Sequence, residues 1–311
     1  MGVMRNMLLR GSESAWLAAK VQKRGFVQRA VRRFMPGDTI EAAVAAAEGL
    51  SGRNISSVLT LLGEAVADRS EAEAVAQHYA EVLAQINSHG ISGHLSLKPT
   101  QFGFDIDPSL CAELIDGLVA RASEIDSFVW IDMEASPYVD GTIELYRGLR
   151  ATHENVGVCL QSYLYRTAKD LESLLEINGT VRLVKGAYKE PSDVAFPSKT
   201  DVDANFMKLA KRLLSADARA GRVRPAFGTH DMQLVTRIRD FAEGAGISKD
   251  DYEIQMLYGI CRNDQVRLSA EGASVRVLIS YGTAWFPWYM RRLAERPANL
   301  GFVVRSVFWR R

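Results

Sequence analysis

The stretch FVWIDME occupies residues 128–134 and has the pattern of a buried β-strand that ends in charge. Its first residues are apolar, while Asp132 and Glu134 stand two positions apart near its end. Alternate residues of a strand face the same side, and a strand that only fills a core rarely carries two carboxylates. The stretch therefore predicts a strand whose C-terminal end carries chemistry.

Seven further runs have a similar form, and helical patterns separate them. Apolar residues at three-and-four spacing in residues 69–90 and 201–221 predict two of these helices. Eight alternations of strand and helix in 311 residues predict an α/β fold of the (β/α)8 TIM barrel type. A doubly wound sheet is the alternative, which is disfavoured because no GxGxxG or P-loop sequence follows any run. The seven runs are ISSVLTLLGE (55–64), GHLSLKPTQFG (93–103), VGVCLQSYL (156–164), VRLVKGAY (181–188), PAFGTHD (225–231), YEIQMLYG (252–259) and VRVLISYG (275–282).

The N-terminal segment is rich in arginine and lysine and poor in acids. It is either a transit peptide or the solvated face of N-terminal helices that touch a membrane surface. We favour the helices, because the segment leads into a helix that Asp38 caps, with Glu41 three residues on as in a capping box and Gly49 at its end. The expected organisation is an N-terminal helical extension, residues 1–50, followed by the barrel as the catalytic domain, residues 51–311.

Composition excludes several classes of protein. Hydrophobic residues make up 47% of the chain and the net charge is +1, so nothing in the overall charge attracts nucleic acid. The cysteines lack any CxxC spacing, which argues against a disulfide framework or a zinc site and favours a reducing, cytoplasmic compartment. No apolar run approaches the roughly 20 residues of a membrane helix. At most, we expect peripheral contact with the inner face of the cell membrane.

Polar residues gather at the ends of the predicted strands, and in a barrel these ends converge on one face. In the fifth run we expect Arg182 to point into the barrel and Lys185 to begin the loop, where Gly186 permits a ligand phosphate to approach closely. No second histidine or cysteine accompanies His230 at a strand end, so no metal site is expected. The strand-end residues are Glu64, Lys98, Asp132, Glu134, Gln161, Lys185, Tyr188, Thr229, His230, Asp231, Gln255 and Tyr258.

Two adjacent arginines, Arg291 and Arg292, follow four aromatic residues in YGTAWFPWYMRRLAERPAN (281–299). They predict a carboxylate site under an aromatic cover; the alternative is two solvated arginines, with Glu295 paired to Arg291 one turn on. Lys98 has two interpretations as well. It is a cation that pairs with Asp132, or the Schiff-base lysine of a barrel aldolase, a role that Lys185 would also fit.

Taken in order, a set of stretches resembles the proline dehydrogenase family, flavoenzymes on a distorted (β/α)8 TIM barrel, in its bacterial monofunctional form. The likeness covers nearly the whole chain and is thin only in the first 35 or so residues. The stretches are LSLKPTQFG (95–103), WIDMEASPYVDGTIELY (130–146), CLQSYLYR (159–166), RLVKGAYKEP (182–191), THD (229–231), QMLYGI (255–260) and RRLAERPAN (291–299).

The resemblance implies roles for individual residues. Asp132 and Arg182 would be catalytic, and Glu64 would pair with Arg291 as a gate when the site is empty. The residues expected around the substrate are Lys98, Tyr188, Leu278, Arg291 and Arg292. The residues expected around FAD are Met133, Gln161, Arg182, Lys185, Gly186, Ala187, Thr229 and His230.

The implied reaction is hydride transfer from C5 of L-proline to N5 of FAD, which yields Δ1-pyrroline-5-carboxylate in the first step of proline catabolism. A cationic cavity would favour the neutral substrate amine. The implied partners are a membrane quinone as electron acceptor and a pyrroline-5-carboxylate dehydrogenase downstream. The family usually has tyrosine where this chain has Leu278, so oxidation of hydroxyproline or a wider set of cyclic imino acids is an alternative. A Schiff-base aldolase and a binding protein without catalysis are the alternatives from other classes.

Overall fold

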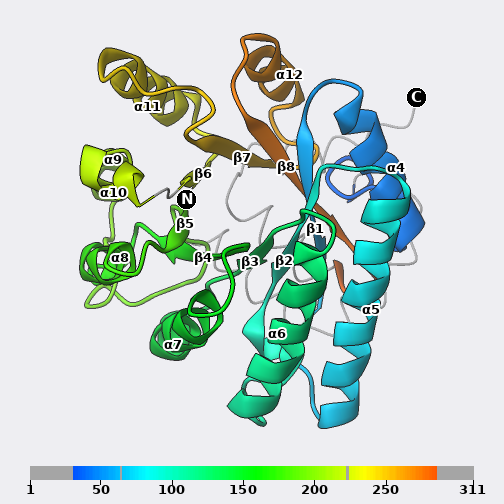
Figure 1. Cartoon of the computed structure of the whole chain (residues 1–311). Helices are drawn as coiled ribbons and strands as arrows, with labels where there is room; N and C mark the ends of the chain where they lie inside the picture. The colour runs from blue at the N-terminus through cyan, green and yellow to red at the C-terminus, as the bar shows by residue number, and fades with distance from the viewer. Residues whose placement is uncertain (1–30, 64, 222–223, 286–311) are drawn as a thin grey trace, which may run out of the picture.

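The computed structural model describes residues 31–63, 65–221 and 224–285, and the molecule within these ranges is a closed barrel of eight parallel strands (Figure 1). Each strand pairs with the next along the chain, and β8 pairs with β1 to close the barrel. The predicted (β/α)8 barrel is confirmed, and each strand lies within or close to its predicted run. The strands are β1 (Ser56–Leu61), β2 (Gly93–Leu97), β3 (Val129–Ile131), β4 (Val156–Gln161), β5 (Thr180–Val184), β6 (Ala226–Gly228), β7 (Glu253–Leu257) and β8 (Val275–Tyr281).

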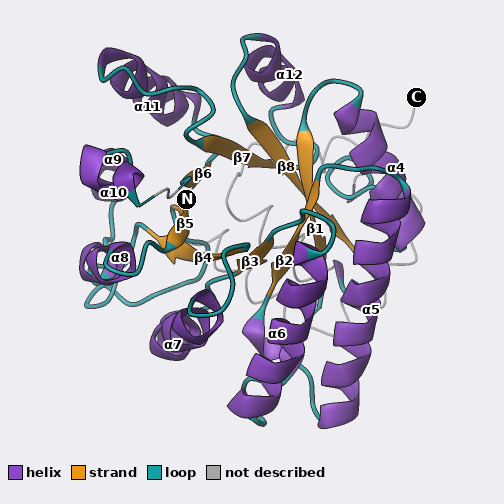
Figure 2. Ribbon diagram, viewed as in Figure 1, coloured by secondary structure: helices purple, strands orange, loops and turns teal. Residues whose placement is uncertain are grey.

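Helices surround the barrel, as Figure 2 shows, and amphipathic sequences place their apolar sides on the strands. In α5, Asp68 caps the first turn by accepting a hydrogen bond from the N–H of Glu71 at 3.0 Å. Among the described residues the helices are α4 (Ile40–Ser51), α5 (Arg69–Ser88), α6 (Pro108–Ser123), α7 (Val139–Arg150), α8 (Thr167–Leu175), α9 (Lys199–Leu213), α10 (Ala216–Ala220), α11 (Met232–Gly244) and α12 (Arg262–Ala270), with short 3-10 helices η1 (Pro99–Phe102) and η2 (Ser136–Tyr138).

Three details of the predicted helices are wrong. The N-cap of α4 is Thr39, whose hydroxyl accepts from the N–H of Ala42 at 3.3 Å, so Asp38 lies before the cap. The helix also passes Gly49 and ends at Ser51, because an interior glycine weakens a helix without having to end it. The helix predicted over residues 201–221 is two helices, α9 and α10, that are separated at Ser215.

The N-terminal helix α4 packs against β1 and β8, where the barrel closes. It therefore covers the outer side of the seam between the first and last strands. The division into an extension over residues 1–50 and a barrel domain over residues 51–311 stays a prediction. Among the described residues, no helix combines the length and the apolar character that crossing a bilayer requires.

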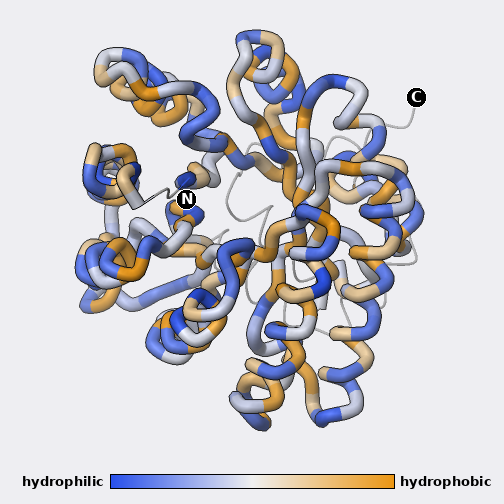
Figure 3. The backbone as a smooth tube through the Cα atoms, in the orientation of Figure 1, coloured by the Kyte–Doolittle hydropathy of each residue, from blue (hydrophilic) through white to orange (hydrophobic). Residues whose placement is uncertain are grey.

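Among the described residues, apolar side chains form a large cluster and a separate small one. The larger lies between the strands and the helices, where the hydrophobic segments of the helices in Figure 3 meet the sheet. The smaller consists of Val58, Trp130 and Ala226, with Phe128 and Leu278 packed against it. These residues belong to or directly precede strands on different sides of the barrel, so the small cluster lies inside it. The barrel interior also carries polar and charged side chains, among them Ser96, Arg182, Glu253, Gln255 and Arg276.

Candidate active site

Asp132, Arg182 and Ser96 form a hydrogen-bonded cluster inside the barrel. Arg182 donates from Nη2 to Ser96 Oγ at 2.8 Å and to Asp132 Oδ1, and Ser96 Oγ donates to Asp132 Oδ1 at 3.0 Å. Asp132 directly follows β3, while Arg182 projects inward from the middle of β5. The prediction that Arg182 points into the barrel and that Lys185 begins the loop is confirmed by these contacts and by the end of β5 at Val184.

The guanidinium of Arg182 is almost completely buried, with 3% of the residue exposed. Burial acts to lower the pKa of Arg182, but the charge of Asp132 opposes it, and the net effect raises the pKa above its usual range. The thiol of Cys159 lies beside this guanidinium, and burial raises its pKa, so the thiol stays protonated. Arg182 is therefore a permanent cation whose charge Asp132 balances.

Glu134 does not share a strand face with Asp132, contrary to the prediction. Strand β3 ends at Ile131, so both carboxylates lie in the following loop and take separate directions. Glu134 accepts hydrogen bonds from the N–H of Thr100 at 3.1 Å and from its hydroxyl at 2.8 Å. Burial raises the pKa of Glu134, while these hydrogen bonds and the charge of Lys98 oppose the rise. Glu134 thus holds η1, the short helix that follows Lys98.

Lys185 lies at the mouth of the barrel between two carboxylates. Its Nζ is 2.5 Å from Oδ1 of Asp203 and 2.9 Å from Oδ2 of Asp231. Lys199 pairs with the same two acids. Burial alone would raise the pKa of Asp231, but hydrogen bonds and charges from the two lysines outweigh it and lower the pKa to about 2. The cluster binds the ammonium of Lys185 firmly, which is unfavourable for a Schiff-base lysine, since that role requires a free amine.

The side chain of Gln161 ends β4 next to the residues that follow β3. Its Nε2 donates to the carbonyls of Met133 and Glu134, each at 3.2 Å. Its Oε1 is buried and has no hydrogen-bond partner among the described residues. Buried acceptors without partners are uncommon in native proteins, so this atom indicates that a ligand donor belongs beside it.

Thr229 and His230 follow β6 and hold the neighbouring loop. The hydroxyl of Thr229 accepts from the N–H of Asp231 at 3.1 Å. Nε2 of His230 accepts from the N–H of Leu257 at 2.8 Å, so this nitrogen carries no proton and the ring's proton lies on Nδ1. The ring of His230 is thus fixed against the backbone that ends β7. Both residues lie at the same end of the barrel as Gln161.

Gly186 adopts a backbone conformation that favours glycine, with φ of +114°. A Cβ at this position would lie 2.3 Å from Cδ1 of Tyr163, so a side chain would also clash. The loop after β5 therefore needs glycine here for backbone reasons. Ala187 is exposed and Tyr188 is partly exposed on the same loop.

Leu278 faces the interior of the barrel, where it packs against the cluster of Val58, Trp130 and Ala226. It is partly exposed, and it lies in β8 beside Leu257 of β7. The predicted gate and carboxylate residues, Glu64, Arg291 and Arg292, lie outside the described residues.

Sequence reasoning missed a second set of polar residues inside the barrel. Gln255 accepts from Arg182, and Glu253 and Arg276 form an ion pair with Nε–Oε distances of 2.9 Å. Gln255 was recognised as a strand-end residue, but not as a partner of Arg182. Glu253 and Gln255 stand two apart in one strand, so they share a face. Charged residues at alternate positions of otherwise apolar strands were the available signal.

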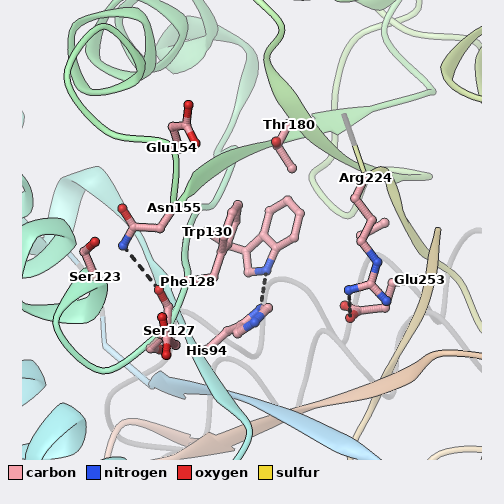
Figure 4. A pocket seen from close by; sticks show the side chains of 12 residues that line it. His94, Ser123, Ser127, Phe128, Trp130, Glu154, Asn155, Thr180, Arg224 and Glu253 are labelled. Atoms are coloured by element: carbon pink, nitrogen blue, oxygen red, sulfur yellow. Dashed lines mark hydrogen bonds and ion pairs between the residues drawn. The ribbon is translucent and has the colours of Figure 1, made fainter. Parts of the chain in front are cut away.

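A cavity of about 380 Å³ opens at the other end of the barrel, where the strands begin (Figure 4). His94, Trp130, Arg224 and Glu253 are among the residues that line it. Active sites of such barrels lie at the C-terminal ends of the strands, so the cavity is not the predicted site. Among the described residues, no group of histidine, cysteine, aspartate or glutamate side chains has the arrangement of a metal site.

Comparison with known proteins identifies the family. The profile described as "Proline dehydrogenase" matches residues 43–305, and the chain belongs to the proline dehydrogenase family. It is 37% identical over 277 residues to Proline dehydrogenase 1 of Bacillus subtilis (strain 168), which covers 89% of this chain and 90% of that protein. It is also 37% identical over 280 residues to the Proline dehydrogenase of Deinococcus radiodurans, which covers 88% of this chain and 89% of the relative.

A solved structure shows the same fold. The structure of proline utilization A from Bdellovibrio bacteriovorus superposes with a TM-score of 0.81 at 23% identity, and the match covers 98% of this chain and 37% of that one. The solved structure therefore has the barrel architecture that the strand pattern of this sequence predicted.

Proposed function

We propose that this protein oxidises L-proline to Δ1-pyrroline-5-carboxylate with FAD as its cofactor. The family membership supports the reaction. The observation that carries the site is the cluster of Asp132, Arg182 and Ser96 inside the barrel. When bound, FAD supplies the acceptor for the hydride that leaves C5 of proline.

The residues present fit a flavin nucleotide. Gln161 Oε1 is a buried acceptor without a partner among the described residues, which suits an N–H of the isoalloxazine ring. We propose that His230 and Lys185, which lie at the same mouth of the barrel, contact the cofactor, with the charge of Lys185 already shared with Asp203 and Asp231. Met133, Gly186, Ala187 and Thr229 complete the set that we propose for FAD.

Arg182 and Asp132 would act on the substrate and on the cofactor together. The hydrogen bonds to Asp132 from Ser96 and Arg182 both go to Oδ1, so Oδ2 can accept from the substrate amine. Arg182 provides a fixed positive charge that stabilises electron density delivered to the cofactor. We assign Lys98 and Tyr188 to the substrate pocket, and Arg291 and Arg292 to the substrate carboxylate, with Glu64 as their gate partner.

The decisive experiment is an anaerobic titration of the purified protein with L-proline, followed through the flavin absorbance. Proline oxidation predicts bleaching in proportion to proline and recovery when a quinone is added. A binding protein would take up proline without bleaching. An aldolase would instead trap its substrate on Lys98 or Lys185 when borohydride is added, and this result without bleaching would overturn the proposal.

A second substrate is supported by Leu278, which lies in the barrel interior without a hydroxyl. An apolar side chain there leaves room and no polar partner, so 4-hydroxyproline and other cyclic imino acids are candidates beside proline. Parallel titrations with L-proline and 4-hydroxyproline decide between them. We further propose that a membrane quinone accepts the electrons through peripheral contact at the inner face of the cell membrane, and that a pyrroline-5-carboxylate dehydrogenase consumes the product.

A further inference from the structure

Arg182 has a support on the side of the guanidinium that faces the beginning of the strands. Its Nη1 donates to Oε1 of Gln255 at 3.3 Å, and Nε2 of Gln255 donates to Oε1 of Glu253 at 2.7 Å. A guanidinium has only donors and a carboxylate only acceptors. The amide of Gln255 can therefore satisfy both neighbours in one orientation, with its oxygen toward Arg182, and Glu253 holds it in that orientation.

Arg276 in turn holds the carboxylate of Glu253 in place. Nε of Arg276 lies 2.9 Å from each oxygen of Glu253, and both side chains are almost completely buried. Nη1 of Arg276 donates to the carbonyls of Ser57 and Ser92, at 3.1 and 3.2 Å. The line from Arg276 through Glu253 and Gln255 to Arg182 thus ends in the backbone of β1 and of the loop before β2.

A second support reaches Arg182 from the same end of the barrel. Its guanidinium lies 5.1 Å from the ring centre of Trp130, which is within cation–π range. The indole N–H of Trp130 donates to Nδ1 of His94 at 3.2 Å (Figure 4). Burial, together with the charges of nearby arginines, lowers the pKa of His94 well below its usual value, so the ring accepts this hydrogen bond in its neutral form.

Stability alone does not account for this arrangement. Barrels of this type are usually filled by branched aliphatic side chains, and replacing buried ion pairs with well-packed apolar residues is often neutral or stabilising. Here Arg182, Arg276 and Glu253 are each at most 5% exposed and occupy the interior instead. A function that depends on the direction of a guanidinium explains why the polar line is kept.

We propose that Gln255 and Glu253 are positioning residues, which hold Arg182 in the orientation that serves the reacting end of the barrel. The proposal rests on the role of Arg182 given under the proposed function. Without the Gln255 acceptor, Nη1 of Arg182 loses a hydrogen bond, and only Asp132, Ser96 and the ring of Trp130 restrict its orientation. Its charge then acts on the bound cofactor from a distribution of positions rather than from one.

The test uses Gln255→Met in the FAD-loaded protein, because methionine keeps the length of the side chain, removes both hydrogen bonds and leaves the ion pair of Glu253 with Arg276 intact. We expect kcat for proline to fall at least tenfold while KM changes less than threefold. We also expect the two-electron reduction potential of the bound flavin to fall by about 30 mV, the equivalent of a tenfold change.

The matched control is Asn155→Leu, another exchange of an amide for an aliphatic side chain. Nδ2 of Asn155 donates to the carbonyls of Val119 and Ser127, at 2.9 and 3.2 Å, and the residue lines the cavity without touching Arg182. We expect this variant to lose thermal stability but to keep the wild-type flavin potential and kcat. An equal loss of potential in the control would show that the effect is structural, and would overturn the proposal.

Gln255→Glu is the conservative variant. It keeps an acceptor for Arg182 but places a carboxyl group beside Glu253, and repulsion between the two acids favours protonation of one of them. We expect the flavin potential to return toward the wild-type value, with a new dependence on pH. Should Gln255→Met fail to fold, Gln255→Glu carries the test. Flavin reduction takes up protons and is pH-dependent in every variant, so a potential that follows the wild-type pH profile throughout would refute the positioning role of Gln255.

Two variants distinguish failure of the proposed function from failure of the positioning role. If Arg182→Met has the wild-type kcat and flavin potential, Arg182 does not have the role given to it under the proposed function. If Arg182→Met loses kcat and flavin potential while Gln255→Met keeps the wild-type values of both, the positioning role alone is refuted.

Discussion

Replacing Asp132 with asparagine tests whether charge holds the buried guanidinium of Arg182. The side chain of Arg182 is 4% exposed and that of Asp132 21% exposed. Removing one partner of a buried pair costs about 3–5 kcal/mol. Because the asparagine keeps an oxygen acceptor, and because Ser96 and Gln255 still accept from Arg182, we expect a smaller loss of about 2–3 kcal/mol in the free energy of unfolding.

The assay is urea unfolding of Asp132→Asn beside Asp140→Asn. Asp140 also pairs with an arginine, Arg166, but its side chain is 84% exposed, so its loss is expected to cost less than about 1 kcal/mol. The same variant should lose about tenfold or more in kcat/KM for proline, since one charge-assisted hydrogen bond contributes roughly 1.5–3 kcal/mol. Equal stability losses in the two variants would refute the reasoning that charge fixes Arg182.

Three further outcomes are expected. Gly186→Ala should lower both Tm and the flavin content of the purified protein, because φ is +114° and a Cβ would lie 2.3 Å from Tyr163. Gly49→Ala is the control, because a Cβ there would meet no atom within 4 Å, and it should lower neither quantity. Equal losses in the two variants would contradict the role given to Gly186. The pKa of Asp231 falls from 3.8 to about 2 on folding, so its stabilisation is complete above about pH 4 and is lost as pH falls toward 2. In urea titrations, the free energy of unfolding of Asp231→Asn should therefore fall less steeply with falling pH over that window. A pH dependence equal to that of the wild type would contradict the assignment. Leu278→Tyr should tighten proline binding and disfavour 4-hydroxyproline, and KM values that do not change for either substrate would show that Leu278 does not shape the pocket.

Local patterns in the sequence were sufficient for the architecture and for part of the site. Alternation with a period of two located the strands, and the point where it stops in VRLVKGAY correctly separated the inward Arg182 from Lys185 in the loop. The ends of strands and helices were less certain. Extending β3 to Glu134 placed two carboxylates on one face, whereas the strand ends at Ile131 and the two side chains diverge.

Only the tertiary structure decided which charge meets which. Arg182 is 50 residues from Asp132, 86 from Ser96 and 73 from Gln255 along the chain, and no local pattern relates them. Closure of the barrel and the register of its strands bring these side chains into contact. The direction of a side chain within a strand follows from the local alternation of the backbone, which the sequence pattern reveals. The partner of that side chain depends on the packing of all eight strands, which exists only once the chain has folded.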